Sequence, residues 1–76
     1  MESFILVKFE EGAGGGVPEH GQKIQRITST RWAWFSDFRE IDPNLYEVKL
    51  KTGAPVAELC VWLEEDPEIE YARDRE

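Results

Sequence analysis

The chain has 76 residues and a formal net charge of −7, from nine Lys and Arg against sixteen Asp and Glu. At this length it forms one domain, residues 1–76, for which 41% hydrophobic residues supply a core. The negative charge repels nucleic-acid phosphates and anionic membrane surfaces, so we expect neither as a partner, and it favours a basic or neutral protein.

The counts of cysteine and histidine limit the chemistry. Cys60 is the single cysteine and His20 the single histidine, which predicts no disulfide, no metal site and no cofactor. His20 has no evident Ser or Cys partner and Cys60 is expected in the core, so we predict that the chain is not an enzyme. No apolar run reaches the roughly 20 residues that span a bilayer. Met1–Phe4 lacks the basic start of a signal peptide, which predicts a cytoplasmic protein as written.

The first predicted strand covers residues 3–9 (SFILVKF). Its alternation gives one face with Ile5, Val7 and Phe9 and another with Phe4, Leu6 and Lys8. The glycine-rich loop at 12–16 is predicted to be a connection, because no Gly-Lys-Ser/Thr follows it. Residues 19–27 are predicted to form a helix that is short or absent, since Gly21 and sparse apolar positions disfavour a long one.

A hairpin is predicted next. Residues 29–41 alternate in part and form its first strand, with one side carrying Trp32, Trp34 and Phe38 and the other Ala33, Phe35 and Asp37. Residues 42–44 (DPN) are a turn, because Pro and Asn suit tight turns. Residues 45–51 form the antiparallel partner strand, whose faces carry Tyr46, Val48 and Leu50 on one side and Glu47, Lys49 and Lys51 on the other.

A second helix begins near Pro55 and ends before Pro67. Its apolar face carries Val56, Leu59, Cys60 and Leu63, at i, i+3, i+4 and i+7. Residues 68–72 form the last strand, with Ile69 and Tyr71 inward, and residues 73–76 (RDRE) are expected to be a mobile charged tail.

This order of elements is βαββαβ, with the first helix short or absent, and it predicts a ferredoxin-like α+β fold. Helices cover one face of the antiparallel sheet in that fold and leave the other open. The open face is expected to carry Phe4, Leu6 and some of the tryptophans. Exposed aromatic groups of this kind are typical of a binding surface.

Several segments of the chain resemble those of one family. They are residues 44–50 (NLYEVKL), Gly53, the helix to Leu63 and, most specifically, residues 66–72 (DPEIEYA). Together they resemble the N-terminal prodomains of subtilisin-like serine proteases, a peptidase-inhibitor family in which a helix ends in Asp-Pro and the last strand reads roughly Val-Glu-Tyr-Ala. Residues 5–9 (ILVKF) and 21–24 (GQKI) are similar to the family's opening strand and to its entry into the second strand.

The resemblance implies an inhibitor, or folding chaperone, of a subtilisin-like serine protease. The open sheet face would lie on two helices of the protease, and the C-terminal tail would enter the substrate cleft. Acidic side chains near the binding edge would meet the N-termini of those helices, and the sequence does not choose among Asp37, Asp42, Glu47, Glu68 and Glu70 for this role. The partner-binding residues expected on this basis are Phe4, Leu6, Trp32, Trp34, Glu47, Glu68, Glu70, Ala72, Arg73, Asp74, Arg75 and Glu76.

Two alternatives stay open. The chain is a free inhibitor, a detached prodomain or a degenerate relative of the family, and a detached prodomain would be extracellular. In place of an inhibitor, it can be a ferredoxin-like assembly module with no protease target, because a fold does not name a function. An inhibitor is expected to be a monomer, whereas a module that pairs its open face with a second copy is a homodimer.

Overall fold

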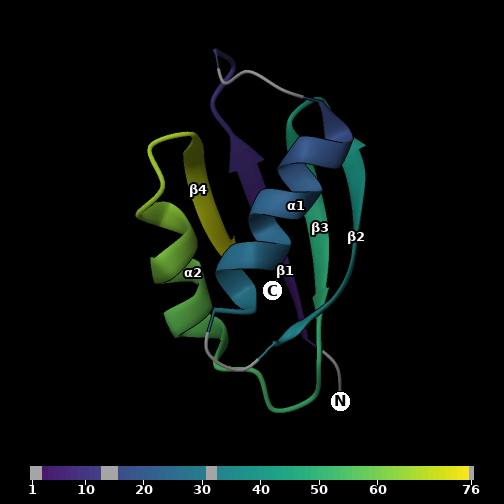
Figure 1. Cartoon of the computed structure of the whole chain (residues 1–76), viewed down its shortest axis with the longest axis vertical. Coiled ribbons are helices and arrows are strands. Elements are labelled where there is room, and N and C mark those ends of the chain that lie inside the picture. Colours follow the sequence, from purple (N-terminus) through teal and green to yellow (C-terminus); the bar gives the residue numbers. More distant parts are fainter. Residues whose placement is uncertain (1–2, 13–15, 31–32, 76) are drawn as a thin grey trace.

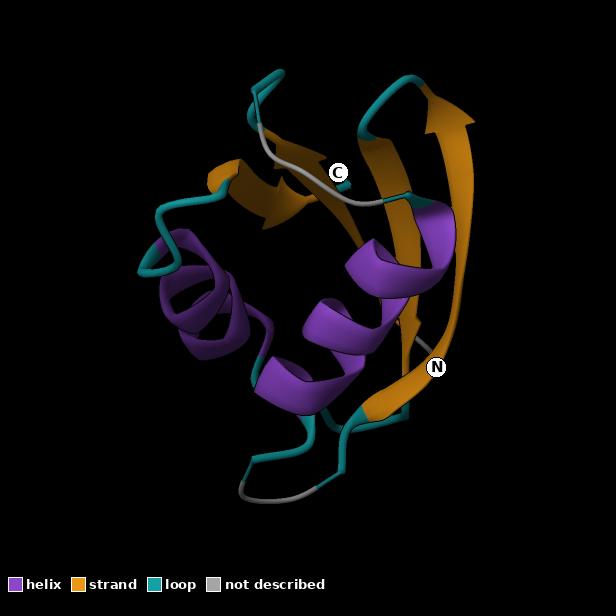
Figure 2. Cartoon of the chain, turned by 45° about the horizontal axis from the view of Figure 1, so that its top comes forward, coloured by secondary structure: helices purple, strands orange, loops and turns teal. Residues whose placement is uncertain are grey.

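The computed structural model describes residues 3–12, 16–30 and 33–75. Its elements are β1 (Ser3–Phe9), α1 (Val17–Thr28), β2 (Phe35–Asp42), β3 (Leu45–Leu50), α2 (Val56–Glu64) and β4 (Ile69–Asp74). The strands form one antiparallel sheet in the order β2-β3-β1-β4. Both helices lie on the same side of this sheet (Figure 1 and Figure 2). The fold is therefore the predicted ferredoxin-like α+β arrangement with one open sheet face.

The first helix is longer than the short or absent helix that the sequence predicted. α1 has 12 residues, with a proline in its first turn, and the Gly16 N–H donates to the Glu19 carboxylate over 3.0 Å. Gly21 does not end the helix, and the Phe38 ring packs where a side chain would be: a Cβ on Gly21 would lie 2.1 Å from Phe38 Cζ. The glycine marks a close approach of β2 to α1, not the end of a helix.

The second strand begins at Phe35, six residues later than predicted, because α1 extends to its C-cap at Ser29. Residues 31 and 32 of the predicted strand lie outside the described part of the chain. The predicted alternation is also wrong here. A register shift between Phe35 and Asp37 turns both Phe35 and Phe38 toward the core, where their ring centroids are 6.1 Å apart.

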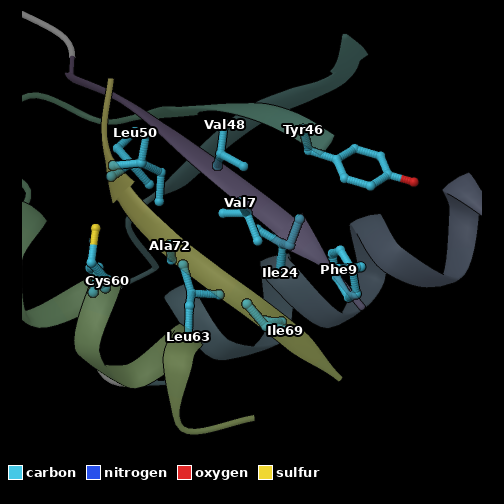
Figure 3. Close-up of a cluster of buried hydrophobic side chains, with 12 residues drawn as sticks. Val7, Phe9, Ile24, Tyr46, Val48, Leu50, Cys60, Leu63, Ile69 and Ala72 are labelled. Carbon is cyan, nitrogen blue, oxygen red and sulfur yellow. The ribbon is translucent and has the colours of Figure 1, made fainter. Parts of the chain in front are cut away.

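The predicted turn and the third strand are confirmed. Residues 43 and 44 connect β2 to β3, and Asn44 has a φ of 64°, which asparagine tolerates better than most residues. Tyr46, Val48 and Leu50 are fully buried, as the alternation predicted. Figure 3 shows them packed with side chains from β1, β4 and both helices. The core consists of Ile5, Val7, Phe9, Ile24, Tyr46, Val48, Leu50, Leu59, Cys60, Leu63, Ile69 and Ala72.

The last strand differs from the prediction in the direction of its side chains. Ile69 pairs with Phe9, Tyr71 pairs with Lys8, and Glu70 between them is left without a register partner, as in a β-bulge. The bulge changes the alternation, so Ile69 and Ala72 face the core while Tyr71 faces the open side. The prediction that Tyr71 points inward is therefore wrong.

The predicted charged tail belongs to the sheet up to residue 75. β4 continues to Asp74, which pairs with Ile5, and the Arg75 N–H donates to the carbonyl oxygen of Phe4 over 3.1 Å. Expecting residues 73–75 to be a mobile tail was thus wrong, because pairing with β1 satisfies their backbone groups. Glu76 lies outside the described residues.

Candidate protein-binding face

The sheet face that the helices leave uncovered carries side chains from all four strands. Paired residues of neighbouring strands share a face, so the register identifies the members. We call them the open face: Phe4, Leu6, Lys8, Asp37, Arg39, Asp42, Leu45, Glu47, Lys49, Tyr71, Arg73 and Arg75.

Glu47 lies at the centre of the open face and is only 7% exposed. Its two carboxylate oxygens accept from two arginines: Arg39 Nε lies 3.1 Å from Oε1, and Arg75 Nη1 lies 3.1 Å from Oε2. A carboxylate with so little solvent needs such partners. Both arginines are more than half exposed, so each pair contributes modestly to stability, and its main effect is to hold the guanidinium groups in place.

Arg73 of β4 and Arg75, just after this strand, lie over aromatic rings of the open face. Arg73 Cζ is 4.8 Å from the centroid of the Tyr71 ring, and Arg75 Cζ is 5.6 Å from that of Phe4. A guanidinium group in this position is attracted by the ring's negative face. The contacts therefore hold positive charge over apolar surface. On the neighbouring strand, Lys8 Nζ donates to the carbonyl oxygen of Pro43 over 3.2 Å.

The open face is hollowed beside Phe4. The hollow has a volume of about 190 Å³ and is lined by Phe4, Asp37, Phe38, Arg39, Glu47 and Lys49. Its wall thus combines aromatic carbon with charges of both signs. It lies on the half of the sheet formed by β2, β3 and the start of β1.

The charge of the open face is opposite to that of the chain. Five of its members are Lys or Arg and three are Asp or Glu, whereas the whole sequence has nine and sixteen. All three acidic members lie on β2 and β3. The half formed by β1 and β4 carries Lys8, Arg73 and Arg75 with no acidic side chain among its register-paired described residues, and the exposed Glu70 of the bulge lies at its edge.

Five of the residues expected to bind a partner lie on this face: Phe4, Leu6, Glu47, Arg73 and Arg75. The residues expected to bind a partner did not include five other members of this surface, Lys8, Arg39, Leu45, Lys49 and Tyr71, whereas Asp37 and Asp42 were expected to meet helix N-termini of the partner. Alternation had already placed Lys8 and Lys49 opposite the core. The net charge of the chain concealed the fact that basic residues gather on that side.

Other expected residues lie elsewhere. Ala72 is buried in the core, and Trp34 packs against the core from a position just before β2, so neither offers a side chain to the open face. The Glu68 carboxylate forms an ion pair with Lys23 of α1, which places it on the side of the helices. The hydrogen bond from the Lys23 ammonium to the Glu68 carboxylate, together with one to Asp66, raises the pKa of Lys23.

Asp74 pairs with Ile5, whose side chain faces the core. Asp74 therefore lies, like Glu68, on the side of the sheet that the helices cover. Glu70 is exposed at the bulge. Trp32 and Glu76, the last two residues expected at the site, lie outside the described residues.

His20, Tyr46 and Cys60 carry polar groups into the buried part of the fold. His20 is 4% exposed, its ring stacks on Phe9 at 4.0 Å, and its Nδ1 lies 2.9 Å from the hydroxyl of Tyr46. Burial, and then the negative charge of Glu40, raises the pKa of Tyr46. Burial also raises the pKa of the Cys60 thiol to about 11, so that this thiol is protonated at neutral pH and is a poor nucleophile.

The described residues include neither a metal-binding group of side chains nor a membrane-spanning helix. Within residues 3–12, 16–30 and 33–75, no group of three or more His, Cys, Asp or Glu side chains is placed to hold a metal ion. Over the same residues, no helix is both long enough and apolar enough to cross a membrane.

Comparison of the chain with protein-family models, with curated proteins and with solved structures gives no match. The resemblance to subtilase prodomains therefore stays an expectation from the sequence. The fold and the open face define an α+β domain with a charged and partly apolar sheet surface, and its function has to be argued from that surface.

Proposed function

We propose that this chain is a protein-binding module that docks through its open face, and that it inhibits a subtilisin-like serine protease or assists its folding. One observation carries the docking proposal: Phe4, Leu6 and Tyr71 are only partly buried on a sheet face that neither helix covers. Charged side chains surround these apolar groups. Protein interfaces combine apolar and aromatic contacts of this kind with charged and polar groups.

The choice of a protease follows from the sequence resemblance, which is strongest over residues 45–72. The geometry narrows which acidic groups can meet the N-termini of the partner's helices. Asp37 and Asp42 are exposed on the open face, whereas Glu47 is held by two arginines and Glu68 by Lys23. Asp37 and Asp42 are therefore the acidic groups that the proposal assigns to those helix ends.

The test is the residual activity of a broad-specificity subtilisin on a chromogenic peptide, titrated with the full chain. The proposal predicts saturable inhibition. Leu6→Arg should weaken it at least about tenfold, because a charge replaces an apolar contact in the middle of the interface. Removing residues 72–76 is a poor alternative, because Ala72 is in the core and residues 73 and 74 are in β4.

Val61→Arg is the matched control. Val61 is 56% exposed on α2, on the helix side of the sheet, so the same change of charge is made away from the open face. Equal inhibition by the Leu6 and Val61 variants would exclude the open face as the contact. Digestion of the chain as an ordinary substrate, with protease activity undiminished, would reject this protease as the target.

Self-assembly through the open face has less support. In a two-fold dimer the same surface meets itself, so a face with five basic and three acidic residues would meet an identical one. The excess of positive over negative groups then opposes association. Sedimentation equilibrium distinguishes the two functions, since the proposal predicts the mass of one chain and the assembly module predicts twice that mass.

A further inference from the structure

We infer that the half of the open face formed by β1 and β4 binds an extended acidic segment of the partner protein, with carboxylates two residues apart. This inference rests on the proposed function, in which the open face binds a protein, and it adds the chemistry of the bound segment. The surface concerned, which we call the basic strip, consists of Phe4, Leu6, Lys8, Tyr71, Arg73 and Arg75.

The first argument is charge. The basic strip has three positive side chains and no acidic one, because Asp74 of β4 pairs with Ile5 and lies on the helix side, and Glu47, which accepts from Arg75, belongs to β3. The chain as a whole has an excess of seven negative charges. The acidic members of the open face lie on β2 and β3. A partner segment that carries carboxylates is attracted to the strip, whereas a basic segment is repelled.

The second argument is spacing. Arg73 of β4 and Arg75, which follows the end of β4 and donates its N–H to Phe4, are separated by one residue, and alternate residues of an extended chain lie about 7 Å apart on the same face. An extended partner segment has the same period, so side chains at its positions i and i+2 meet the two guanidinium groups. Arginine is suited to this contact because its planar fork can donate two parallel hydrogen bonds to one carboxylate.

The third argument is that the arginines are already positioned. Arg73 lies over the Tyr71 ring, and Arg75 lies over Phe4 and also donates to Glu47. Binding therefore costs less side-chain entropy than it would for free arginines. Leu6 of β1 lies between Phe4 of the same strand and Tyr71 of β4. It offers an apolar contact to a neighbouring residue of the acidic segment.

A single-stranded nucleic acid is the competing anion, and two observations disfavour it. Base stacking needs free ring faces, but the Tyr71 and Phe4 rings each have an arginine over them. An oligonucleotide also brings one negative charge per nucleotide toward a chain of net charge −7. A peptide with a few carboxylates meets less of this repulsion.

The experiment is an NMR titration of the ¹⁵N-labelled full chain at low salt. The probe is an extended peptide in which Glu and Val alternate, and the comparison ligands are the same peptide with Lys in place of Glu and a short oligo-deoxythymidine. We expect the Glu peptide to shift amide signals of β1 and β4, with affinity that falls as salt is added. The Lys peptide should cause no such shifts.

Arg73→Gln tests the residue that is central to the inference. It should weaken binding of the Glu peptide about tenfold, the effect of one lost charge-assisted contact. Arg26→Gln is the matched control, because it makes the same change of charge at an exposed position of α1 on the other side of the sheet. It should leave the affinity unchanged, and thermal unfolding verifies that both variants are folded.

The outcomes separate this inference from the proposed function. Shifts at β1 and β4 that are equal for the Glu and Lys peptides would overturn the preference for acidic segments and leave the open face as a protein contact. Tighter binding of oligo-deoxythymidine than of the Glu peptide would replace the protein partner with a nucleic acid. The absence of shifts from the Glu peptide, together with intact inhibition of subtilisin, would overturn the inference alone.

Discussion

Gly21→Ala tests how α1 packs on the sheet. In an exposed helix, replacing glycine by alanine stabilises by about 0.5–1 kcal/mol. At Gly21, however, the new Cβ would lie 2.1, 2.4 and 2.8 Å from three atoms of the Phe38 ring. These distances are far shorter than any normal contact between carbon atoms, so the ring or the helix must move.

The magnitude follows from two opposing terms. Forcing an extra carbon into a packed site costs about 1–3 kcal/mol, and the helix gains up to about 1 kcal/mol, so the free energy of unfolding should fall by about 1–2 kcal/mol. In a domain of this size that lowers Tm by about 5–15 °C. Urea denaturation followed by circular dichroism and tryptophan fluorescence measures the change.

The sign should reverse when the ring is removed. In a Phe38→Ala background the alanine at position 21 meets no ring, so the substitution should raise the free energy of unfolding by about 0.5–1 kcal/mol. Gly12→Ala is the control for the general effect of removing a glycine, because nothing lies within 4 Å of a Cβ there. A stabilising Gly21→Ala in the unmodified chain would refute the packing argument.

Three further changes probe other parts of the fold. Gly53 has a φ of 87°, so Gly53→Ala should lower the free energy of unfolding by about 1–2 kcal/mol in the same denaturation assay. Tyr46→Phe should lower it by about 1–2 kcal/mol, because the buried His20 Nδ1 loses its 2.9 Å hydroxyl partner. Cys60, whose thiol has its pKa raised to about 11, should react with iodoacetamide at pH 8 only as fast as the chain unfolds. Between about pH 9 and about pH 11 the thiol of the unfolded chain (pKa 9.0) loses its proton, whereas the folded thiol keeps it. Cys60 should therefore lower the free energy of unfolding as the pH rises over this range, and denaturation at a series of pH values measures the change.

Local periodicity was sufficient to predict much of the fold. Strict alternation over residues 45–50 identified β3 and its buried face, and the i, i+3, i+4, i+7 spacing identified α2. Pro43 and Asn44 gave the turn between β2 and β3. Each of these signals lies within a few residues of the chain and does not depend on a distant partner.

The errors occurred where a distant partner decides the conformation. Gly21 suggested a broken helix because the sequence does not show that the Phe38 ring lies against it. Tyr71 was placed inward because the bulge at Glu70 arises from pairing with β1. A bulge adds one residue to one strand and so reverses the alternation beyond it. Alternation alone cannot reveal where that happens.

The net charge was a poor guide to the binding surface for a related reason. Exposed charges are screened over about 8–10 Å at physiological ionic strength, so a partner that touches the sheet responds mainly to the charges of that face. Neighbouring strands lie about 5 Å apart and alternate residues of a strand about 7 Å apart, which brings Arg73 within that distance of both Lys8 and the ring-bound Arg75. The acidic groups of the helices lie on the opposite side of the sheet from the open face, and those of the turns lie at its ends (Figure 1 and Figure 2). The seven excess negative charges therefore govern long-range repulsion, and the basic strip governs the contact. Such a division predicts that added salt acts in two opposing ways, speeding the approach of an acidic partner while weakening the bound complex.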